Sequence, residues 1–471
     1  MKLYFSILCL TAMVCIGCKE DSKTDYAFLG GEIINATDNF VILSMDDTVV
    51  DTIKLDGNNR FIYKIDNLKT GFHTFKHGGE LQMVLLEPND SLMLRLNTYE
   101  FDESLVFTGI GAKKNNYFIN EFLQNEIEET RVFKYCQLNS KSFSHRIDSI
   151  KSYKNKKLIK FQKKHSPSDL FIKIAQANID YSYYASKEIY PFIHYGKSKC
   201  DIVKSLPKDF YAYRKDIDYN NDFHKDYFIY NNFLRSNLNN LALEKHTSHS
   251  DSDEFNRKSL CFNLDKLHLI DSIVKIPAVK NKLLFHNTFG FLSKNDNEKH
   301  NSAILKSFLQ KSTSEENKTS ISTLVIALNK LKAGNSFPNI EILDLKNGET
   351  EINTLINKPT AIYFWSHNFY DHFKDSHIKV NELKDKYPEI DFIAVNIDNP
   401  KSGVWMSSLH KNKFSIKKEY QLRFPKKALK ILAIHPMTKV FVLDKDQKIV
   451  HSNTNMFASN FEEQLLALIS K

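Results

Sequence analysis

The stretch KPTAIYFWSHNFYDH, residues 358–372, decides the fold of the last third of the chain. Residues 361–365 within it, AIYFW, are an unbroken apolar run, which is typical of a strand buried on both faces of a parallel sheet. A helical pattern follows and ends at Tyr387-Pro388, where the proline stops it. The run DFIAVNID at residues 391–398 predicts a second buried strand. Two parallel strands joined through a helix form a right-handed crossover, so an α/β domain is expected here.

The flanking segments extend this domain over residues 332–471. The segment AGNSFPNI at 333–340 leads into it, and DLKNG at 344–348 predicts a turn. The segment VFVLDKDQKIV at 440–450 predicts a hairpin, and FEEQLLALI at 461–469 predicts a closing helix. A strand, a helix and a strand that are followed by a hairpin and a helix make up the thioredoxin topology.

The same residues resemble the TlpA/ResA-like thioredoxin family. Four short segments carry the resemblance: GNSFP at 334–338, FWS at 364–366, VNID at 395–398 and VLDKDQKIV at 442–450. The resemblance implies a thioredoxin fold. It also implies, in the family, thiol–disulfide exchange through a Trp-Cys-x-x-Cys motif that follows Phe-Trp-Ala-x.

Both motif cysteines are absent from this chain. Phe369 stands in the place of the attacking cysteine and His372 in that of the resolving cysteine. Exchange needs a thiolate at a helix N-terminus and a second sulfur to resolve the mixed disulfide, and a benzyl ring supplies neither. No cysteine follows Cys261, so a peroxiredoxin-type mechanism also lacks its thiol. We therefore expect no catalytic residue, no cofactor and no enzymatic activity.

The second hallmark of the family is a cis-proline that faces the redox pair. Counting back from Asp444 without gaps places Thr438 there, whereas Pro436 fits only with a two-residue insertion. The ungapped alignment is simpler, and a cis bond before threonine is costly. We therefore expect the cis-proline to be lost or shifted.

Three histidines near this motif do not predict a metal site. His367, His372 and His377 recur every five residues. This spacing turns them about 140° apart on a helix, whereas ligands on one face recur at i,i+4. His372 lies near a helix start, but no partner for it as a general base is evident. No metal ligands are predicted.

The N-terminus predicts export and lipidation. Residues 1–17 have the short basic start and the apolar run of a lipoprotein signal peptide. Gly17-Cys18 resembles the end of a lipobox, with Cys15 where leucine is usual, so Cys18 is predicted to be diacylated. The alternative is an ordinary secretory signal. Residues 18–26 would be a tether, in which Lys19-Glu20-Asp21 resembles a surface-export tag of some Gram-negative bacteria. The expected location is the cell envelope, as an outer-membrane lipoprotein that faces the periplasm or the cell surface.

The predicted mature chain keeps three further cysteines, Cys136, Cys200 and Cys261. An odd number of thiols leaves at least one unpaired. Their spacing matches no zinc or CxxC pattern, so we interpret them as buried or incidental. A disulfide between two of them is compatible with the sequence, which does not choose the pair.

Residues 27–112 predict a small antiparallel β-sandwich or barrel. Alternating runs at 49–55 and 60–65 flank the turn Asp56-Gly57-Asn58-Asn59 and indicate a hairpin. Runs at 81–86 and 91–96 continue the pattern. The segments LEPNDS (86–91) and FTGIGA (107–112) resemble the β domain that often precedes thioredoxin-like domains in exported lipoproteins.

Residues 113–331 predict helices. The lysine-rich segment 151–164 is interpreted as a solvated helix face rather than a membrane or polyanion contact. The aromatic-rich segment 181–233 is interpreted as core packing with a ligand groove, not as a nucleic-acid surface. The segment 244–254 is metal-like in composition but fits no EF-hand, so a polar surface loop is predicted.

Together these parts predict a multidomain α+β protein with an N-terminal antiparallel β domain, a central helical region and a C-terminal α/β thioredoxin-like domain. The 471 residues exceed what one core holds, and the net charge of +9 is too mild to indicate nucleic acid. The leading hypothesis is an envelope lipoprotein whose redox-inactive domain is a binding or scaffolding module for an envelope protein. One alternative is a TlpA/ResA-like thiol–disulfide oxidoreductase with altered or partner-dependent activity. Another is a lipoprotein that binds a small-molecule ligand beside a nutrient-uptake system.

Overall fold

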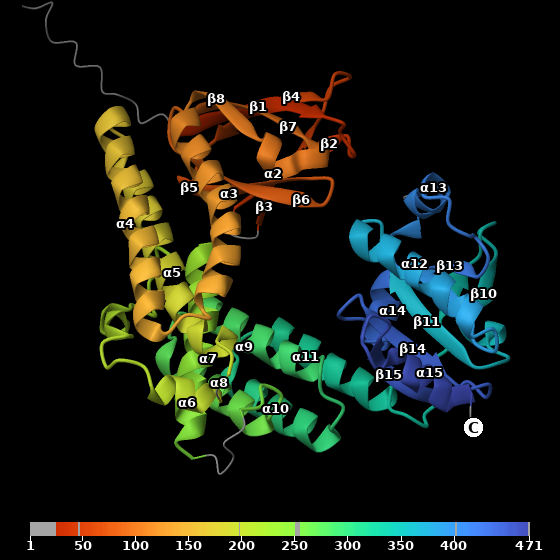
Figure 1. The fold of residues 1–471 in the computed structure, drawn as a ribbon. Helices are drawn as coiled ribbons and strands as arrows, with labels where there is room; N and C mark the ends of the chain where they lie inside the picture. Colours follow the sequence, from red (N-terminus) through yellow and green to blue (C-terminus); the bar gives the residue numbers. More distant parts are fainter. Residues whose placement is uncertain (1–24, 46–47, 197, 250–254, 401–402, 470–471) are drawn as a thin grey trace, which may run out of the picture. The chain divides into compact units, whose positions relative to one another are not determined.

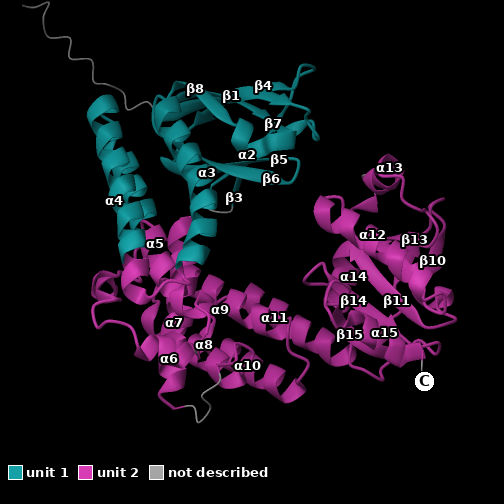
Figure 2. Ribbon diagram, in the orientation of Figure 1, with its two compact units in different colours: residues 1–135, 145–180 teal, residues 136–144, 181–471 magenta. Residues whose placement is uncertain are grey.

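The computed structural model describes residues 25–45, 48–196, 198–249, 255–400 and 403–469 (Figure 1). The predicted signal peptide, Cys18 and most of the tether lie outside the described residues. The chain divides into two compact units, residues 1–135 with 145–180 and residues 136–144 with 181–471 (Figure 2). The predicted helical segment contributes to both units, and the α/β domain lies in the second.

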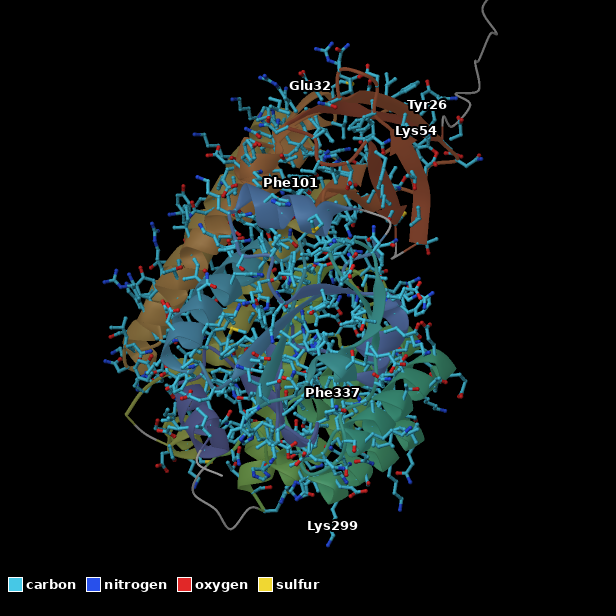
Figure 3. All side chains as sticks on the ribbon, turned by 90° about the vertical axis from the view of Figure 1, so that its right-hand side faces the viewer. Tyr26, Glu32, Lys54, Phe101, Lys299 and Phe337 are labelled. Atoms are coloured by element: carbon cyan, nitrogen blue, oxygen red, sulfur yellow. The ribbon has the colours of Figure 1, made fainter. Side chains whose placement is uncertain are left out.

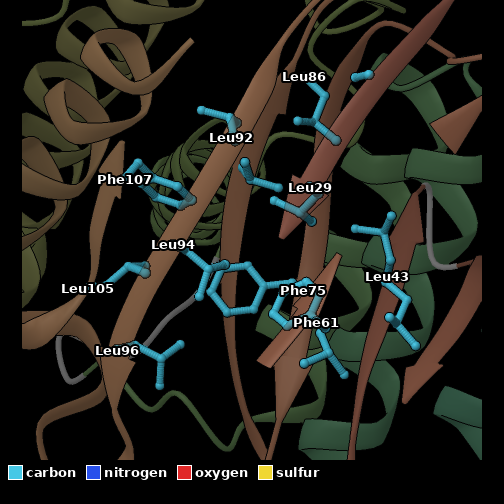
Figure 4. Close-up of a cluster of buried hydrophobic side chains, with 14 of the residues drawn as sticks. Leu29, Leu43, Phe61, Phe75, Leu86, Leu92, Leu94, Leu96, Leu105 and Phe107 are labelled. Carbon is cyan, nitrogen blue, oxygen red and sulfur yellow. The ribbon is translucent and has the colours of Figure 1, made fainter. Parts of the chain in front are cut away.

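Two four-stranded sheets form the β domain of the first unit. The first has the order β4 (Arg60–Asp66), β1 (Tyr26–Ile34), β7 (Ser91–Asn97), β8 (Val106–Ile110), and the second has the order β3 (Thr48–Lys54), β2 (Phe40–Met45), β5 (Gly71–His77), β6 (Glu80–Leu86). Phe101 is buried in this domain, whereas Lys54 is exposed (Figure 3). Side chains from both sheets, among them Leu29, Leu43 and Phe75, form one apolar core (Figure 4). Each such fully buried side chain contributes about 1.5–3 kcal/mol.

The predicted hairpin at 49–65 is wrong, although its strands and its turn exist. Asp56 Oδ1 accepts hydrogen bonds from the backbone N–H groups of Asn58 and Arg60, both at 2.8 Å, and so holds the turn. However, β3 pairs with β2 and β4 pairs with β1, so the turn joins the two sheets. The pair β1 and β7 is parallel, unlike its neighbours. Alternation shows which face of a strand is buried, but it does not specify the partner strand.

Helices form the rest of the first unit and much of the second. They are η1 (Thr98–Glu100), α2 (Phe101–Ser104), α3 (Ala112–Tyr135), α4 (Ser140–His165), α5 (Asp169–Ile193), α6 (Lys199–Lys204), η2 (Ala212–Asp216), α7 (Phe228–Thr247), α8 (Leu260–Ile273), α9 (Pro277–Leu292), α10 (Glu298–Lys311) and α11 (Glu315–Lys330). Side chains of Ser259, Asn297 and Ser314 cap the starts of α8, α10 and α11. Apolar residues of α7 to α11 form one shared core.

The lysine-rich segment 151–164 is not simply a solvated face. Lys154 on α4 is only 4% exposed, and its Nζ lies 2.8 Å from Glu128 and 3.5 Å from Glu121 on α3. Lys157 pairs with Glu121 at 2.6 Å. The solvated-face interpretation holds for the exposed Lys156, Lys160, Lys163 and Lys164. It fails for Lys154, because composition does not show that a lysine on the packed side of a helix meets acidic residues of its neighbour.

The α/β domain has the predicted architecture. Its sheet has the order β10 (Glu349–Glu351), β9 (Glu341–Leu343), β13 (Glu419–Leu422), β12 (Asp391–Asn396), β11 (Thr360–Trp365), β14 (Lys439–Leu443), β15 (Ile449–Asn455). The strand β11 is parallel to β12 and antiparallel to β14. The other elements are η3 (Ile352–Leu355), α12 (Tyr370–Lys386), α13 (Val404–Lys411), α14 (Pro425–Ile431) and α15 (Phe461–Ile469). Separate apolar cores lie on the two faces of the sheet, and all residues of β11 and β12 are buried.

Candidate functional site

The candidate site is the turn between β11 and α12, where the thioredoxin topology places its redox motif. Asp398, two residues after β12, holds this turn: it accepts hydrogen bonds from the Ser366 hydroxyl and from the His367 backbone N–H, the latter at 2.8 Å. The Ser366 hydroxyl in turn accepts from the Asn368 N–H at 3.1 Å. The turn is therefore rigidly attached to the end of the neighbouring strand, and α12 begins directly after Phe369.

Phe369 presents a bare aromatic ring at the N-terminus of this helix. The residue is 54% exposed, and the next residue, Tyr370, is 45% exposed. A helix N-terminus stabilises an anion such as a thiolate. Because phenylalanine carries no ionisable group, that field has no nucleophile to activate at this position.

His372 is attached to the fold rather than presented to solvent. Its Nε2 lies 3.1 Å from the carbonyl oxygen of Phe364, which can only accept, so Nε2 carries the proton. The ring also forms a hydrogen bond with the backbone of Met437, on the segment before β14. Burial lowers the pKa of His372, and the Phe364 bond opposes this only in part. The imidazole is therefore neutral at neutral pH and cross-links two segments of the domain.

A cis-proline is present, and it is shifted relative to the ungapped count. The cis peptide bond of the described residues joins His435 to Pro436, so the gapped alignment is correct and Thr438 is not the equivalent position. A turn after α14 holds the extra residues: the His435 N–H donates to Ala433 O at 3.0 Å, and the Lys439 N–H donates to Pro436 O at 3.1 Å. A loop of this kind takes up an insertion that an ungapped comparison of sequences cannot show.

Lys439 is a buried lysine whose side chain contacts this turn. It is 3% exposed, and its Nζ donates to the carbonyl oxygens of Leu432 at 3.0 Å and Ala433 at 3.1 Å. Burial lowers its pKa to about 7, and the charge of Asp296 opposes this shift. The Lys439 ammonium group thus caps α14 by donating to two carbonyl oxygens at its C-terminal end.

Comparison with known proteins gives relatives for part of the chain. No family model matches it. The thiol-disulfide oxidoreductase ResA of Bacillus cereus is 28% identical over 150 residues, which are 30% of this chain and 79% of that protein. A solved thioredoxin domain of a thiol-disulfide oxidoreductase from Bacteroides vulgatus is 18% identical, with a TM-score of 0.24, over 29% of this chain and 97% of that one. A solved thioredoxin-like protein from Bacteroides caccae is 12% identical, with a TM-score of 0.32, over 56% of this chain and 95% of that one.

The last third of the chain has a thioredoxin-like fold and is similar to the TlpA/ResA-like thioredoxin family. The order of its sheet, the retained motif segments and the Bacillus relative agree on this assignment. It departs from that family at the two positions that would carry the exchanging sulfurs.

The three histidines near the motif, His367, His372 and His377, face separate partners. His367 Nδ1 lies 3.0 Å from the Ser408 hydroxyl, whereas His372 bonds the Phe364 carbonyl. His377 is buried, and its Nε2 lies 3.1 Å from Glu419, which also accepts from Trp365 Nε1 at 3.1 Å. The structure therefore does not bring these histidines together around one point.

Sequence reasoning missed three polar residues that organise the thioredoxin domain: Asp398, Glu419 and Lys439. Asp398 belongs to the VNID segment, so its role could have been inferred from an acid directly after a buried strand. Glu419 and Lys439 begin β13 and β14, and neither position is marked by a motif.

Cysteines outside the thioredoxin domain do not supply the missing dithiol. In the described part of the chain Cys136, Cys200 and Cys261 all remain thiols. Cys136 and Cys200 are buried as predicted, and burial raises the pKa of Cys136 to about 12. Cys261 is exposed, which the sequence did not predict.

The metal-like segment forms a polar cluster with α8. Residues up to Thr247 belong to α7 rather than to the predicted loop. His246, His249, Cys261 and Asp265 place donor atoms within 4.8 Å of one another. In a tetrahedral zinc site the donor atoms lie about 3.4 Å from one another. Here the separations reach 4.8 Å, whereas His249 Nε2 and Asp265 lie 2.8 Å apart, which is a hydrogen-bond distance. In this arrangement His249 and Cys261 form hydrogen bonds with Asp265, whereas His246 Nδ1 lies 3.6 Å from Asp265 and forms no hydrogen bond with it.

Among the described residues, no helix is both long enough and apolar enough to cross a bilayer.

Proposed function

We propose that this chain is an envelope-anchored lipoprotein whose thioredoxin domain binds a partner protein without exchanging disulfides. The observation that carries the proposal is the pair Phe369 and His372. The first position holds an exposed ring and the second holds a neutral imidazole that cross-links the fold. Neither residue can form or resolve a mixed disulfide.

Exposed aromatic side chains support a binding role for this end of the domain. Phe369, Tyr370 and Phe457 are 54%, 45% and 45% exposed. The ring of Phe457 lies 6.2 Å from that of His372, so it belongs to the same region of the surface. Aromatic residues that stay exposed around a site are enriched at protein interfaces. The partner that fits this surface is an envelope protein with an apolar segment.

Disulfide reduction tests the redox part of the proposal. The purified full chain is incubated with insulin and dithiothreitol, and insulin precipitation is followed by turbidity. We expect the rate to equal that of dithiothreitol alone, because the thioredoxin domain carries no thiol. A rate clearly above that background, in protein free of contaminating thioredoxin, would overturn the non-catalytic assignment.

A second candidate is a thiol–disulfide oxidoreductase whose activity depends on a partner's cysteine. The Bacillus relative is named a thiol-disulfide oxidoreductase, and this observation favours the candidate. The test is the same assay with the products of neighbouring genes added one at a time. Acceleration only in the presence of a cysteine-bearing partner would support this candidate over a binding module.

A further inference from the structure

A cavity of about 360 Å³ lies among α7, α8 and α9 of the second unit. Its described lining contains basic side chains and no acidic one. The basic residues are Arg235, Arg257, Lys258, Lys266, His286 and Lys294. Such a one-sided charge differs from the mixed charges elsewhere in this unit, where Arg214, for example, pairs with two glutamates.

Separate elements converge to make this lining. Arg235 lies on α7, Lys266 on α8 and His286 on α9, and Lys294 follows the end of α9. Neutral groups fill the space between the charges. They are the amides of Asn239, Asn263, Asn287 and Asn295 and the rings of Phe192, Phe262 and Phe291. The cavity therefore offers both charge and hydrogen-bonding groups beside aromatic surface.

Lys266 is the innermost charge. It is 8% exposed, and its Nζ donates to Asn239 Oδ1 at 3.0 Å and lies 5.1 Å from the centre of the Phe262 ring. No carboxylate of the described residues lies within ion-pair distance of this nitrogen. Burial and the charges of Arg257 and Lys294 lower its pKa to about 8. A buried ammonium with neighbours of the same sign is unfavourable unless an anion joins it.

The other basic side chains of the lining can also bind an anion. The Arg257 guanidinium lies 4.8 Å from the centre of the Phe192 ring. Among the described residues, no carboxylate pairs with Arg235, Arg257, Lys258 or Lys294. A guanidinium presents a planar fork of N–H donors that matches the oxygens of a phosphate or sulfate.

We propose that this cavity binds a small molecule that carries two or more phosphate or sulfate groups. The tetrahedral oxyanions would meet Lys266, Arg235 and the outer cations, and the uncharged body would meet the asparagine amides and the phenylalanine rings. A volume of about 360 Å³ lies within the usual range of small-molecule sites and suits a ligand of sugar size. The lining of this site shares no residue with the turn between β11 and α12.

Isothermal titration calorimetry of the purified full chain at fixed ionic strength tests this proposal. The probes are pyrophosphate, inorganic phosphate, inorganic sulfate and neutral glucose. We expect saturable binding of pyrophosphate, weaker binding of the two single oxyanions and none of glucose. The order of phosphate and sulfate then shows which oxyanion the site prefers. If no oxyanion probe saturates below about 10 mM, or if glucose binds as tightly as pyrophosphate, the proposal is wrong.

Two variants locate the binding. Lys266→Met removes the inner charge and keeps a long apolar side chain, and Arg235→Gln removes a second charge on another helix. Each should weaken pyrophosphate binding by about tenfold or more, because each removes a desolvated partner of the anion. The matched control is Lys299→Met on α10, where the lysine is exposed and outside the lining (Figure 3). Thermal melting checks that each variant folds. Equal affinity in the wild type and in both folded cavity variants would overturn the assignment.

Discussion

Phe369 and His372 lie one helical turn apart but meet different surroundings. The ring at 369 has no polar neighbour to bond and remains in solvent, whereas the imidazole at 372 replaces a thiol with two hydrogen bonds to the backbone. A neutral imidazole has one N–H, which Nε2 carries here and donates to the Phe364 carbonyl. The substitution has therefore turned a reactive position into a structural one.

The double variant Phe369→Cys with His372→Cys tests how much of the redox site survives. Residues three apart at a helix start are close enough for a disulfide. We expect an internal disulfide, detected by mass spectrometry, and insulin reduction well below that of a TlpA/ResA-type enzyme. The helix N-terminus lowers the pKa of the first thiol, but Asp371 inside the motif raises it. The matched control, Phe369→Ser with His372→Ser, should show neither. Turnover at the level of the family would mean that the surrounding site is intact.

Lys439 predicts a specific dependence of stability on pH. Its pKa falls from 10.5 to about 7 in the folded state. Below pH 7 the lysine is charged in both states, and burying it costs stability. Between pH 7 and about 10 the unfolded chain binds the extra proton, so stability rises by about 1 kcal/mol per pH unit. Urea unfolding at several pH values should show a steeper rise in the wild type than in Lys439→Met, in which the lowered pKa of Lys266 still contributes between about pH 8 and 10. The exposed control Lys445→Met should keep the rise, and parallel curves for wild type and Lys439→Met would refute the assignment.

At the scale of elements, a buried carboxylate joins α5 to η2 and α7. Glu188 is 0% exposed. It accepts from Arg214 Nε at 2.9 Å, from the Tyr213 hydroxyl at 2.7 Å and from Asn237 at 2.7 Å. Burial lowers the pKa of Arg214, but the hydrogen bonds and charge of Glu188 outweigh this effect and raise the pKa above its usual value. Apolar contacts bring these elements together, and this network sets their register.

Removing the Glu188 carboxylate should therefore destabilise the second unit strongly. We expect Glu188→Ala to lower the free energy of unfolding by about 3–5 kcal/mol, because the Arg214 charge would remain buried without this partner. Urea unfolding followed by circular dichroism measures the change. The control Glu316→Ala removes an exposed glutamate of α11 and should change stability by less than about 0.5 kcal/mol. If Glu188→Ala lowered the free energy of unfolding as little as the control does, the network would not be stabilising.

The sequence predicted elements better than their partners. The strands at 49–55 and 60–65 were identified by alternation, and the turn between them by Asp-Gly-Asn-Asn. Their assignment to one hairpin was wrong because pairing depends on which sheet each buried face joins. Likewise, the lysines at 151–164 were identified as helical, but their acidic partners on α3 lie about thirty residues away in sequence.

At the scale of the whole molecule, the anchor remains a prediction, since Cys18 lies outside the described residues. We expect Cys18→Ser to move the protein from the membrane fraction to the soluble fraction, because acyl chains would supply the attachment. Fractionation with palmitate labelling measures this in cells. The control Cys261→Ser should leave the protein in the membrane fraction. Unchanged membrane association of Cys18→Ser, or no label in the wild type, would refute lipidation at this residue.

The sequence by itself determined the thioredoxin architecture and the absence of its exchanging thiols. Both are local facts: the apolar runs that make β11 and β12 are contiguous, and a missing sulfur at 369 or 372 needs no geometry to recognise. Only the tertiary structure decided that Pro436 is the cis-proline, that His372 cross-links Phe364 and Met437, and that cations from three helices and their flanking segments line one cavity. These depend on loop length and on contacts between residues far apart in sequence. Hydrophobic periodicity records which side of an element is buried, but not what that side meets.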